Sequence, residues 1–330
     1  LNSASKHIPS FLDACRNVLD EIKDGSVVDF QKEMNKMTFL LFCKVLYGSD
    51  LDHLFNSKID FLDENNNVVQ KKCYEVFIQL CLDLLFEFYN PLSHIIPFLA
   101  DSGWYGLPYR NNVNKATFCK ALGEFLKKSK DTKSVAYQLR QGGQFTEDEI
   151  FCDLVLLMTG GTETSSHALT SIMFFLKKYP EIMKRLKAEL EEQGITKENI
   201  EKEGSDCITM EKLQEMNYLT CIIKESMRYD SPVSDTFIYQ TNEKTEICDV
   251  SIPKSSIIKV DIFGVHFNEE NWIEPFKFEP DRFNADTEFG KRQKKERGID
   301  PFSSRAFSFG LRSCPGQTFA MIEMKAIVAY

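Results

Sequence analysis

One cysteine lies in a short glycine-flanked loop directly before a helix, and this feature constrains the fold more than any other. Cys314 stands between Gly310 and Gly316, and a run of helix-forming residues, 317–330, follows. Glycine lets a backbone approach a flat ligand or adopt a positive φ. Because a helix N-terminus favours negative charge, the thiol is expected to sit as the thiolate that binds metals. The alternative is an ordinary buried cysteine at a helix start.

The residues around this cysteine resemble the ligand loop of the cytochrome P450 family, the haem-thiolate monooxygenases. The family pattern has five places at fixed spacing, and all are filled, by Phe307, Gly310, Arg312, Cys314 and Gly316. The resemblance implies that Cys314 is the axial iron ligand of a haem b and that Arg312 pairs with a haem propionate. It also implies that Phe307 packs under the porphyrin. A thiolate ligand favours cleavage of the O–O bond.

A long predicted helix begins at the capping box Thr146-Glu-Asp-Glu149 and ends near Tyr179. Its first half, residues 150–158, is apolar on nearly every side, so we expect it to be buried. Two adjacent glycines, Gly160 and Gly161, then cost this helix about 2 kcal/mol relative to alanine. Glycines there would let a flat ligand and a small molecule approach the backbone of the helix.

Glu163 and Thr164 follow these glycines and complete a pattern that resembles the family's central-helix motif. A carboxylate in an apolar setting is a common proton donor near neutral pH. A threonine here can bond the carbonyl of Gly160 or hold a water. The resemblance implies that Glu163 and Thr164 help to deliver protons to dioxygen, with Gly160 and Gly161 beside the cofactor. The alternative is a helix-packing notch with Glu163 on a solvated face.

Three charged residues match two further family motifs. Glu225 and Arg228 stand at i, i+3 in a predicted helix, 219–229, a spacing that alone indicates only a surface contact. Arg282 lies in a segment that resembles the family's Pro-Glu-Arg-Phe stretch, with Asp281 in place of the usual glutamate. The resemblance implies that Glu225, Arg228 and Arg282 form a buried triad that braces the cysteine loop, since buried charges persist only when paired.

The periodicity of the remaining chain predicts a mainly α fold with a small β portion, and the resemblance implies a single incomplete P450 domain over 1–330. Helical periodicity appears at 8–22, 30–45, 73–89, 114–128 and 181–193, and strand-like segments at 236–240, 246–250 and 257–260. Family members often carry a propionate-binding arginine in the first of these strands, and this chain has none. The segment 60–70 and the stretch around 97–108 are predicted loops.

The two ends of the chain predict a fragment. The sequence starts at Leu1 without methionine and stops at Tyr330 inside a predicted helix. We therefore expect that an N-terminal part with a membrane anchor and the C-terminal end of a P450 are missing. No apolar run approaches the roughly 20 residues that span a bilayer.

Charge and cysteine content limit the partners. The net charge of −9 does not indicate a nucleic-acid partner, and ten cysteines without paired spacing indicate a reducing compartment. A basic run precedes the cysteine loop and predicts either a solvated loop or a docking patch for an acidic reductase. The basic residues of this run are Lys291, Arg292, Lys294, Lys295 and Arg297.

Together with the resemblance, these motifs imply a monooxygenase that inserts one oxygen atom of O2 into an apolar substrate. The implied location is the cytosolic face of the endoplasmic reticulum membrane, with electrons from NADPH through a cytochrome reductase. Two alternatives stay open. A haem-thiolate isomerase or dehydratase would use the same cysteine without a proton relay, and a truncated chain would bind haem without catalysis or fail to hold it.

Overall fold

The computed structural model describes residues 5–23, 25–49, 56–89, 106–236, 238–298, 300 and 302–330. This part of the chain is mainly α-helical, as predicted, and its strands form three two-stranded antiparallel sheets. The described residues divide into two compact units. One unit is Pro9–Ser166, and the other is His167–Tyr330 with the first residues of the chain. The long helix α9 (Glu147–Lys178) contributes to both units.

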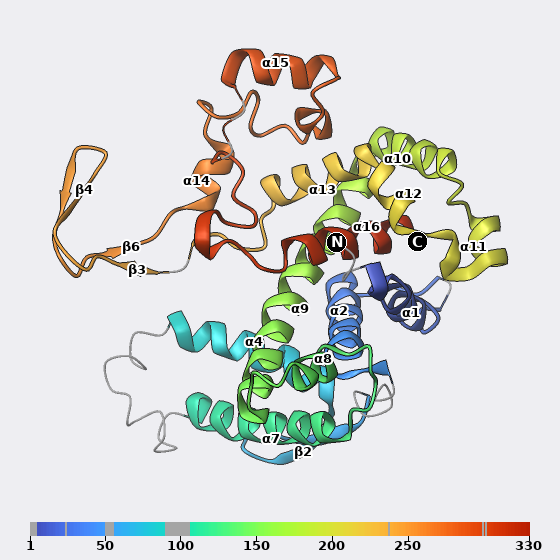
Figure 1. Cartoon of the computed structure of the whole chain (residues 1–330), viewed down its shortest axis with the longest axis vertical. Coiled ribbons are helices and arrows are strands. Elements are labelled where there is room, and N and C mark those ends of the chain that lie inside the picture. The colour runs from blue at the N-terminus through green and yellow to red at the C-terminus, as the bar shows by residue number, and fades with distance from the viewer. Residues whose placement is uncertain are drawn as a thin grey trace. The chain divides into compact units, whose positions relative to one another are not determined.

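The Pro9–Ser166 unit is organised around α2, whose residues from Met34 to Tyr47 are all buried. The helices predicted at 8–22, 30–45, 73–89 and 114–128 are all present (Figure 1). The elements that lead up to α9 are α1 (Ile8–Leu19), α2 (Phe30–Tyr47), β1 (Lys58–Leu62), β2 (Val68–Lys72), α4 (Cys73–Tyr89), α7 (Gly106–Lys128) and α8 (Val135–Gly142).

The prediction of a loop over 60–70 is wrong, because most of this segment belongs to the antiparallel hairpin β1–β2. Only its tip is a turn, in which Asn66 has a φ of 61° and the Asp63 carboxylate accepts two backbone N–H groups. The side-chain amide of Asn114 on α7 then bonds both backbone groups of Leu62, at 2.7 and 3.1 Å. This anchor comes from a helix 52 residues away in the chain, so the local polar composition does not reveal it.

The prediction that Gly106 and Pro108 belong to an irregular stretch is also wrong, since both lie in the first turn of α7. The first four N–H groups of a helix have no partner within the helix. A proline there therefore loses no hydrogen bond. Residues 90–105, which include most of the predicted loop around 97–108, lie outside the described residues.

The second unit continues from α9 with further helices and two small sheets. Its helices are α10 (Pro180–Glu192), α11 (Lys197–Glu203), α12 (Met210–Glu215), α13 (Asn217–Tyr229), α14 (Ile262–Phe267), α15 (Glu288–Arg297) and α16 (Gln317–Ala329). Its 3₁₀ turns are η3 (Gly204–Cys207), η4 (Pro280–Phe283) and η5 (Gly310–Arg312), and a further turn, η1 (Ser5–His7), precedes α1.

Helix α13 is the centre of this unit and packs against α10, α14, α16 and η4. Its first N–H groups have no partner within the helix, and the Glu189 carboxylate of α10 accepts two of them. These bonds come from Tyr218 at 2.6 Å and Leu219 at 2.8 Å. Lys325 of α16 donates to the carbonyl of Leu213 at 2.7 Å, which ties α16 to α12. Glu225 and Arg228 therefore lie on the buried part of a helix that its neighbours hold in place.

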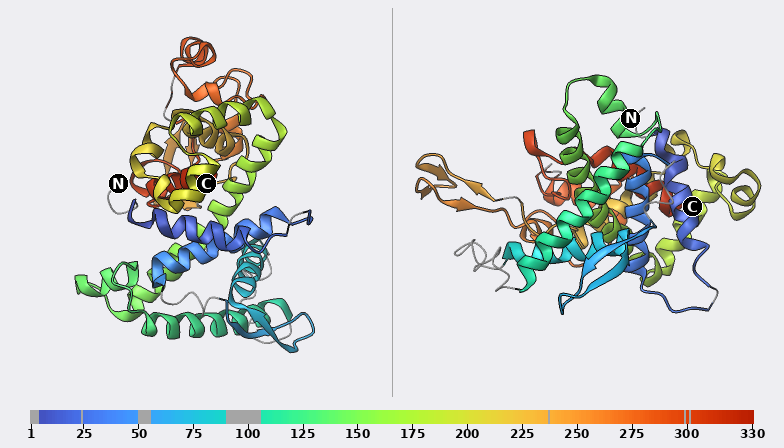
Figure 2. Two further views of the ribbon diagram at one scale, coloured as in Figure 1. Left: turned by 90° about the vertical axis from the view of Figure 1, so that its right-hand side faces the viewer. Right: turned by 90° about the horizontal axis from the view of Figure 1, so that it is seen from below.

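The predicted strands are present in part. Strand β3 (Tyr239–Gln240) pairs with β6 (Ile257–Ile258), and β4 (Thr245–Ile247) pairs with β5 (Val250–Ile252). The prediction of one strand over 246–250 is wrong, because Cys248 and Asp249 have φ values of 49° and 62° and turn the chain between two strands. Figures 1 and 2 show these strands projecting from the helices of their unit.

Among the described residues, no helix combines the length and the apolar character needed to cross a bilayer.

Candidate functional site

Cys314 lies in an exposed loop that leads into the N-terminus of α16. Its backbone N–H donates to the carbonyl of Phe307 at 2.9 Å, which closes the loop over 307–314. Gly310 has a φ of 76°, in the left-handed region that a side chain would strain. A Cβ at Gly316 would lie an ordinary 3.7 Å from the Cys314 sulfur. The loop therefore presents the thiol on the surface of its unit, next to a helix start.

The side chains beside this thiol combine apolar surface with one positive charge. Leu311 is fully exposed, Phe309 is half-exposed, and Phe307 is partly buried. Arg312 is also exposed. An accessible sulfur donor, apolar flanks and a guanidinium for a carboxylate are the groups that a haem b requires from its protein. The residues present at the loop thus fit that cofactor.

Glu225, Arg228 and Arg282 form a buried ion cluster in the same unit. Glu225 accepts two bonds from Arg228, at 2.8 and 2.9 Å, and faces the Arg282 Nε at 3.3 Å. The charged side chains have no exposed surface. Burial lowers the pKa of Arg282, and the Glu225 carboxylate opposes that shift. One carboxylate from α13 therefore holds two guanidinium groups, one of them from η4.

The remaining donors of the cluster bind main-chain carbonyls. Arg228 donates to His266 at 2.8 Å, and Arg282 donates to Glu274 and Lys277 at 3.1 Å each. The backbone N–H of Glu279 donates to the Glu225 carboxylate at 2.8 Å. Since buried charges are stable only when their hydrogen-bonding groups are satisfied, this network fixes the segment 274–282 against α13.

Asp281, the departure from the family pattern, is bound outside the cluster. Its two carboxylate oxygens accept from Arg185 of α10 at 2.8 and 3.0 Å. The Arg185 guanidinium also lies 4.0 Å from the ring centre of Tyr218. The shorter aspartate therefore binds η4 to α10 at a half-exposed position, as a second ion pair beside the buried one.

The two glycines of α9 differ in what surrounds them. A Cβ at Gly161 would lie 2.1 Å from the ring of Phe42, whereas a Cβ at Gly160 would meet nothing within 4 Å. The hydroxyl of Thr164 donates to the carbonyl of Gly160 at 2.6 Å. Gly161 therefore serves the packing of α9 on α2, and the roles of both glycines beside a cofactor remain predictions.

The prediction that residues 150–158 are buried on all sides is wrong. Ile150, Leu154 and Met158 are buried and share one stripe of α9, but Leu156 and Leu157 are 70% and 41% exposed. The other stripe of α9 follows the helical period and contains residues 153, 156, 157, 160 and 164. Apolar composition alone could not reveal this, because which side of a helix is covered depends on its neighbours.

Glu163 and Thr164 lie in the Pro9–Ser166 unit, while Cys314 and the ion cluster lie in the other. Both side chains on α9 are partly buried. The Glu163 carboxylate lies close enough to Cys81 of α4 to contribute, after burial, to raising the pKa of that thiol to about 12. His167 of α9 lies 3.3 Å from the carboxylate of Asp230, and its hydrogen bond lowers the pKa of that carboxyl.

The basic run 291–297 is part of helix α15, so the expectation of a loop is wrong. Thr287 caps this helix by accepting the N–H of Gly290 at 3.1 Å. Arg292 pairs with Glu274 and Glu296, at 3.0 and 3.1 Å. Lys294 and Lys295 are exposed, and Figures 1 and 2 show α15 at the periphery of its unit.

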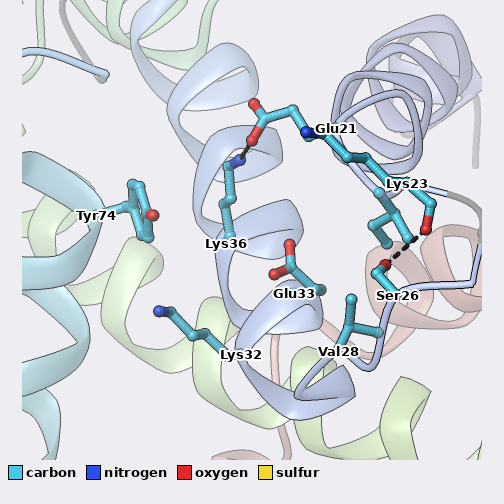
Figure 3. Close-up of a pocket in the computed structure, with 9 residues that line it drawn as sticks. Glu21, Lys23, Ser26, Val28, Lys32, Glu33, Lys36 and Tyr74 are labelled. Carbon is cyan, nitrogen blue, oxygen red and sulfur yellow. Dashed lines mark hydrogen bonds and ion pairs between the residues drawn. The ribbon is translucent and has the colours of Figure 1, made fainter.

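A hollow of about 280 Å³ lies in the Pro9–Ser166 unit, between α2, α4 and the segment that joins α1 to α2 (Figure 3). Lysine and glutamate side chains line it together, and the ammonium group of Lys36 pairs with the carboxylate of Glu21. Lys23, Lys32 and Glu33 also line the hollow, so three lysines face two glutamates there. None of the predicted site residues lines the hollow.

Comparison with known proteins gives a consistent result. The family model described as Cytochrome P450 matches residues 8–330. Mouse cytochrome P450 3A25 is 25% identical over 320 residues, which cover 95% of this chain and 59% of that protein. Rat cytochrome P450 4F5 is 35% identical over 188 residues, covering 57% of this chain and 33% of that protein. The chain thus spans less than two thirds of the length of these relatives.

The fold is also that of solved structures. Retinoic acid-bound cyanobacterial CYP120A1 superposes with a TM-score of 0.77 at 20% identity, over 99% of this chain and 67% of that chain. The haem domain of cytochrome P450DA superposes with a TM-score of 0.72 at 14% identity, over 99% and 66%.

Proposed function

Because the chain belongs to the cytochrome P450 family, we propose that it is a haem-thiolate monooxygenase that acts on an apolar substrate. The observation that carries this proposal is the exposed thiol of Cys314, held in a closed loop at the start of α16. Haem b, bound through that thiolate, supplies the activation of O2 and the insertion of one oxygen atom into the substrate. The steps below belong to the residues of this chain.

In this proposal the cysteine loop binds the haem and orients it. The positive φ of Gly310 and the bond from the Cys314 N–H to Phe307 hold the sulfur in one place. The guanidinium of Arg312 pairs with a haem propionate, and Phe307 packs against the porphyrin.

The α9 motif holds protons and excludes water. The Thr164 hydroxyl, bonded to the carbonyl of Gly160 at 2.6 Å, can turn from that carbonyl to donate its proton. The partly buried carboxyl of Glu163 resupplies it. Leu156 and Leu157 share the exposed stripe of this helix with Gly160. Apolar side chains beside a proton-donating hydroxyl support an apolar substrate.

A redox partner supplies the electrons in this proposal, from NADPH through a reductase at the endoplasmic reticulum membrane. The support is the exposed basic surface of α15, which suits an acidic partner. Reversing the charges of Lys294 and Lys295 should slow reduction by the reductase and flatten its dependence on salt. Lys197→Glu, on the exposed surface of α11, is the matched control. Equal reduction rates in all three proteins would remove α15 from the docking surface.

The chain supplied with haem, reduced and exposed to carbon monoxide tests the proposal directly. A strongly red-shifted Soret band is expected for a thiolate ligand, and Cys314→Ser should abolish the shift. Cys248→Ser, at an exposed cysteine in the β4–β5 turn, should keep it. An unshifted band in the unmodified chain would contradict the assignment of Cys314. A product formed only with NADPH, reductase and O2 then separates a monooxygenase from an isomerase or dehydratase.

A further inference from the structure

His266 on α14 joins the buried ion cluster to the segment that leads into the cysteine loop. The residue has no exposed surface. Its backbone carbonyl accepts from Arg228 at 2.8 Å, and its ring Nε2 accepts the backbone N–H of Arg305, also at 2.8 Å. One residue therefore contacts the cluster with its main chain and the cysteine segment with its side chain.

Arg305 is connected in turn to Cys314. The carbonyl of Arg305 accepts the N–H of Ser308 at 2.9 Å, and Ser308 has a φ of 60°, so the chain turns sharply here. Phe307, inside this turn, provides the carbonyl that holds the Cys314 N–H. A displacement of Arg305 would therefore move the group that positions the cysteine backbone.

The protonation state of the ring suits this contact. Burial, and then the nearby charge of Arg228, lower the pKa of His266 to about 4, so the ring is neutral at physiological pH and Nε2 can accept. Its Nδ1 has no hydrogen-bond partner among the described residues. A buried polar atom without a partner is unfavourable, so an apolar side chain would fill this space better. The hydrogen bond from Arg305 explains the presence of a histidine.

We propose that His266 is the positioning residue of the cysteine loop. It transmits the rigid geometry of the Glu225, Arg228 and Arg282 cluster to residues 305–314, and so sets where the Cys314 thiol is presented. This inference deepens the proposed function and rests on it only for the identity of Cys314 as the haem ligand. No motif or spacing marks His266 in the sequence, because it is a lone histidine in a short apolar helix.

Amide hydrogen exchange of the full chain without haem tests the mechanical part of the proposal. His266→Leu removes the acceptor at similar volume, and His266→Gln keeps an acceptor at a similar reach. The control is Gln293→Leu, which removes buried bonds to Ile273 and Asn271 but none to the cysteine segment. Peptides covering 302–316 and 217–229 report on the loop and on α13.

The amides of 305–314 should exchange about tenfold faster in His266→Leu, because one buried hydrogen bond no longer opposes local opening. They should return close to the unmodified rate in His266→Gln and stay unchanged in Gln293→Leu, with α13 unaffected throughout. If His266→Leu does not fold, His266→Asn, whose side chain is too short to reach Arg305, takes its place. Two results would show that His266 is an ordinary core residue. One is that the amides of 305–314 exchange at the same rate in His266→Leu as in the unmodified chain, and the other is that exchange accelerates equally in the loop and in α13.

The haem-loaded proteins provide a spectroscopic readout. In His266→Leu, part of the carbon monoxide complex should lose the red-shifted Soret band, and His266→Gln should restore it. A full red shift in His266→Leu would overturn the proposed link to the ligand. If the unmodified chain itself lacks the red shift, the proposed function fails, while the exchange data still decide whether His266 positions the loop.

Discussion

Replacing Glu225 by glutamine isolates what burial adds to an ion pair. The change keeps the size of the side chain and removes one negative charge that faces two buried guanidinium groups. The amide can accept at only one atom and directs its NH2 group at arginine donors. Glu225→Gln should therefore leave Arg228 and Arg282 close together without an anion between them.

The magnitude follows from the contacts. Glu225 accepts two buried bonds from Arg228, at 2.8 and 2.9 Å, and a part-buried one from the backbone of Glu279 at 2.8 Å. Removing one partner of a buried pair lowers the free energy of unfolding by about 3–5 kcal/mol. Natural domains have about 5–15 kcal/mol in total, so this single change removes a large share of the stability that is typical of a domain.

Asp281→Asn is the matched control, because it makes the same chemical change in an ion pair of the same length. Asp281 accepts from Arg185 at 2.8 and 3.0 Å, but the Arg185 side chain is 49% exposed. Solvent screens such a pair, so the expected loss is at most about 1 kcal/mol. Both losses are measured as shifts in the midpoint of urea unfolding.

Haem content provides the second readout of the same variant. We expect Glu225→Gln to lose haem rather than to retain it and turn over slowly, because the cluster acts on the fold. A loss of stability no larger than that of Asp281→Asn would refute the argument from burial. Full haem content with slow turnover would instead assign Glu225 a role in the reaction.

Two further predictions concern α9 and the buried histidine. Gly161→Ala should lower the free energy of unfolding by about 1–3 kcal/mol, because its Cβ would overlap a phenylalanine ring. Gly160→Ala should raise the free energy of unfolding by up to about 1 kcal/mol. Urea unfolding distinguishes the two variants, and equal effects would contradict the packing argument. Because burial and Arg228 lower the pKa of His266 from 6.5 to about 4, the unfolded chain binds a proton that the folded chain excludes between these values. Stability is then complete above about pH 6.5 and falls by about 3 kcal/mol as the pH drops to about 4. This part of the urea-midpoint pH profile should disappear in His266→Gln, and a profile that is unchanged in the variant would assign the titration to another group.

Elements with local signals can be predicted from the amino-acid sequence alone. The helix Cys73–Tyr89 and the limits of α9 follow from apolar periodicity, from a capping box and from a proline. The capping box is present, with Thr146 and Glu149 bonding each other's backbone N–H groups at 2.8 and 3.3 Å. The spacing of the cysteine motif is likewise readable without coordinates, because all five of its residues lie within ten positions.

The covered surfaces and the contacts between distant groups could not be predicted in this way, because they depend on the packing of the whole chain. Leu154 and Leu156 lie in the same apolar stretch of the sequence. Leu154 is buried and Leu156 is exposed, because neighbouring elements cover only one side of α9. Arg282 reaches a carboxylate 57 residues earlier in the chain, and the ring of His266 reaches a backbone N–H 39 residues later. Such contacts depend on how the chain returns to itself, whereas propensity and periodicity act over one or two turns of a helix.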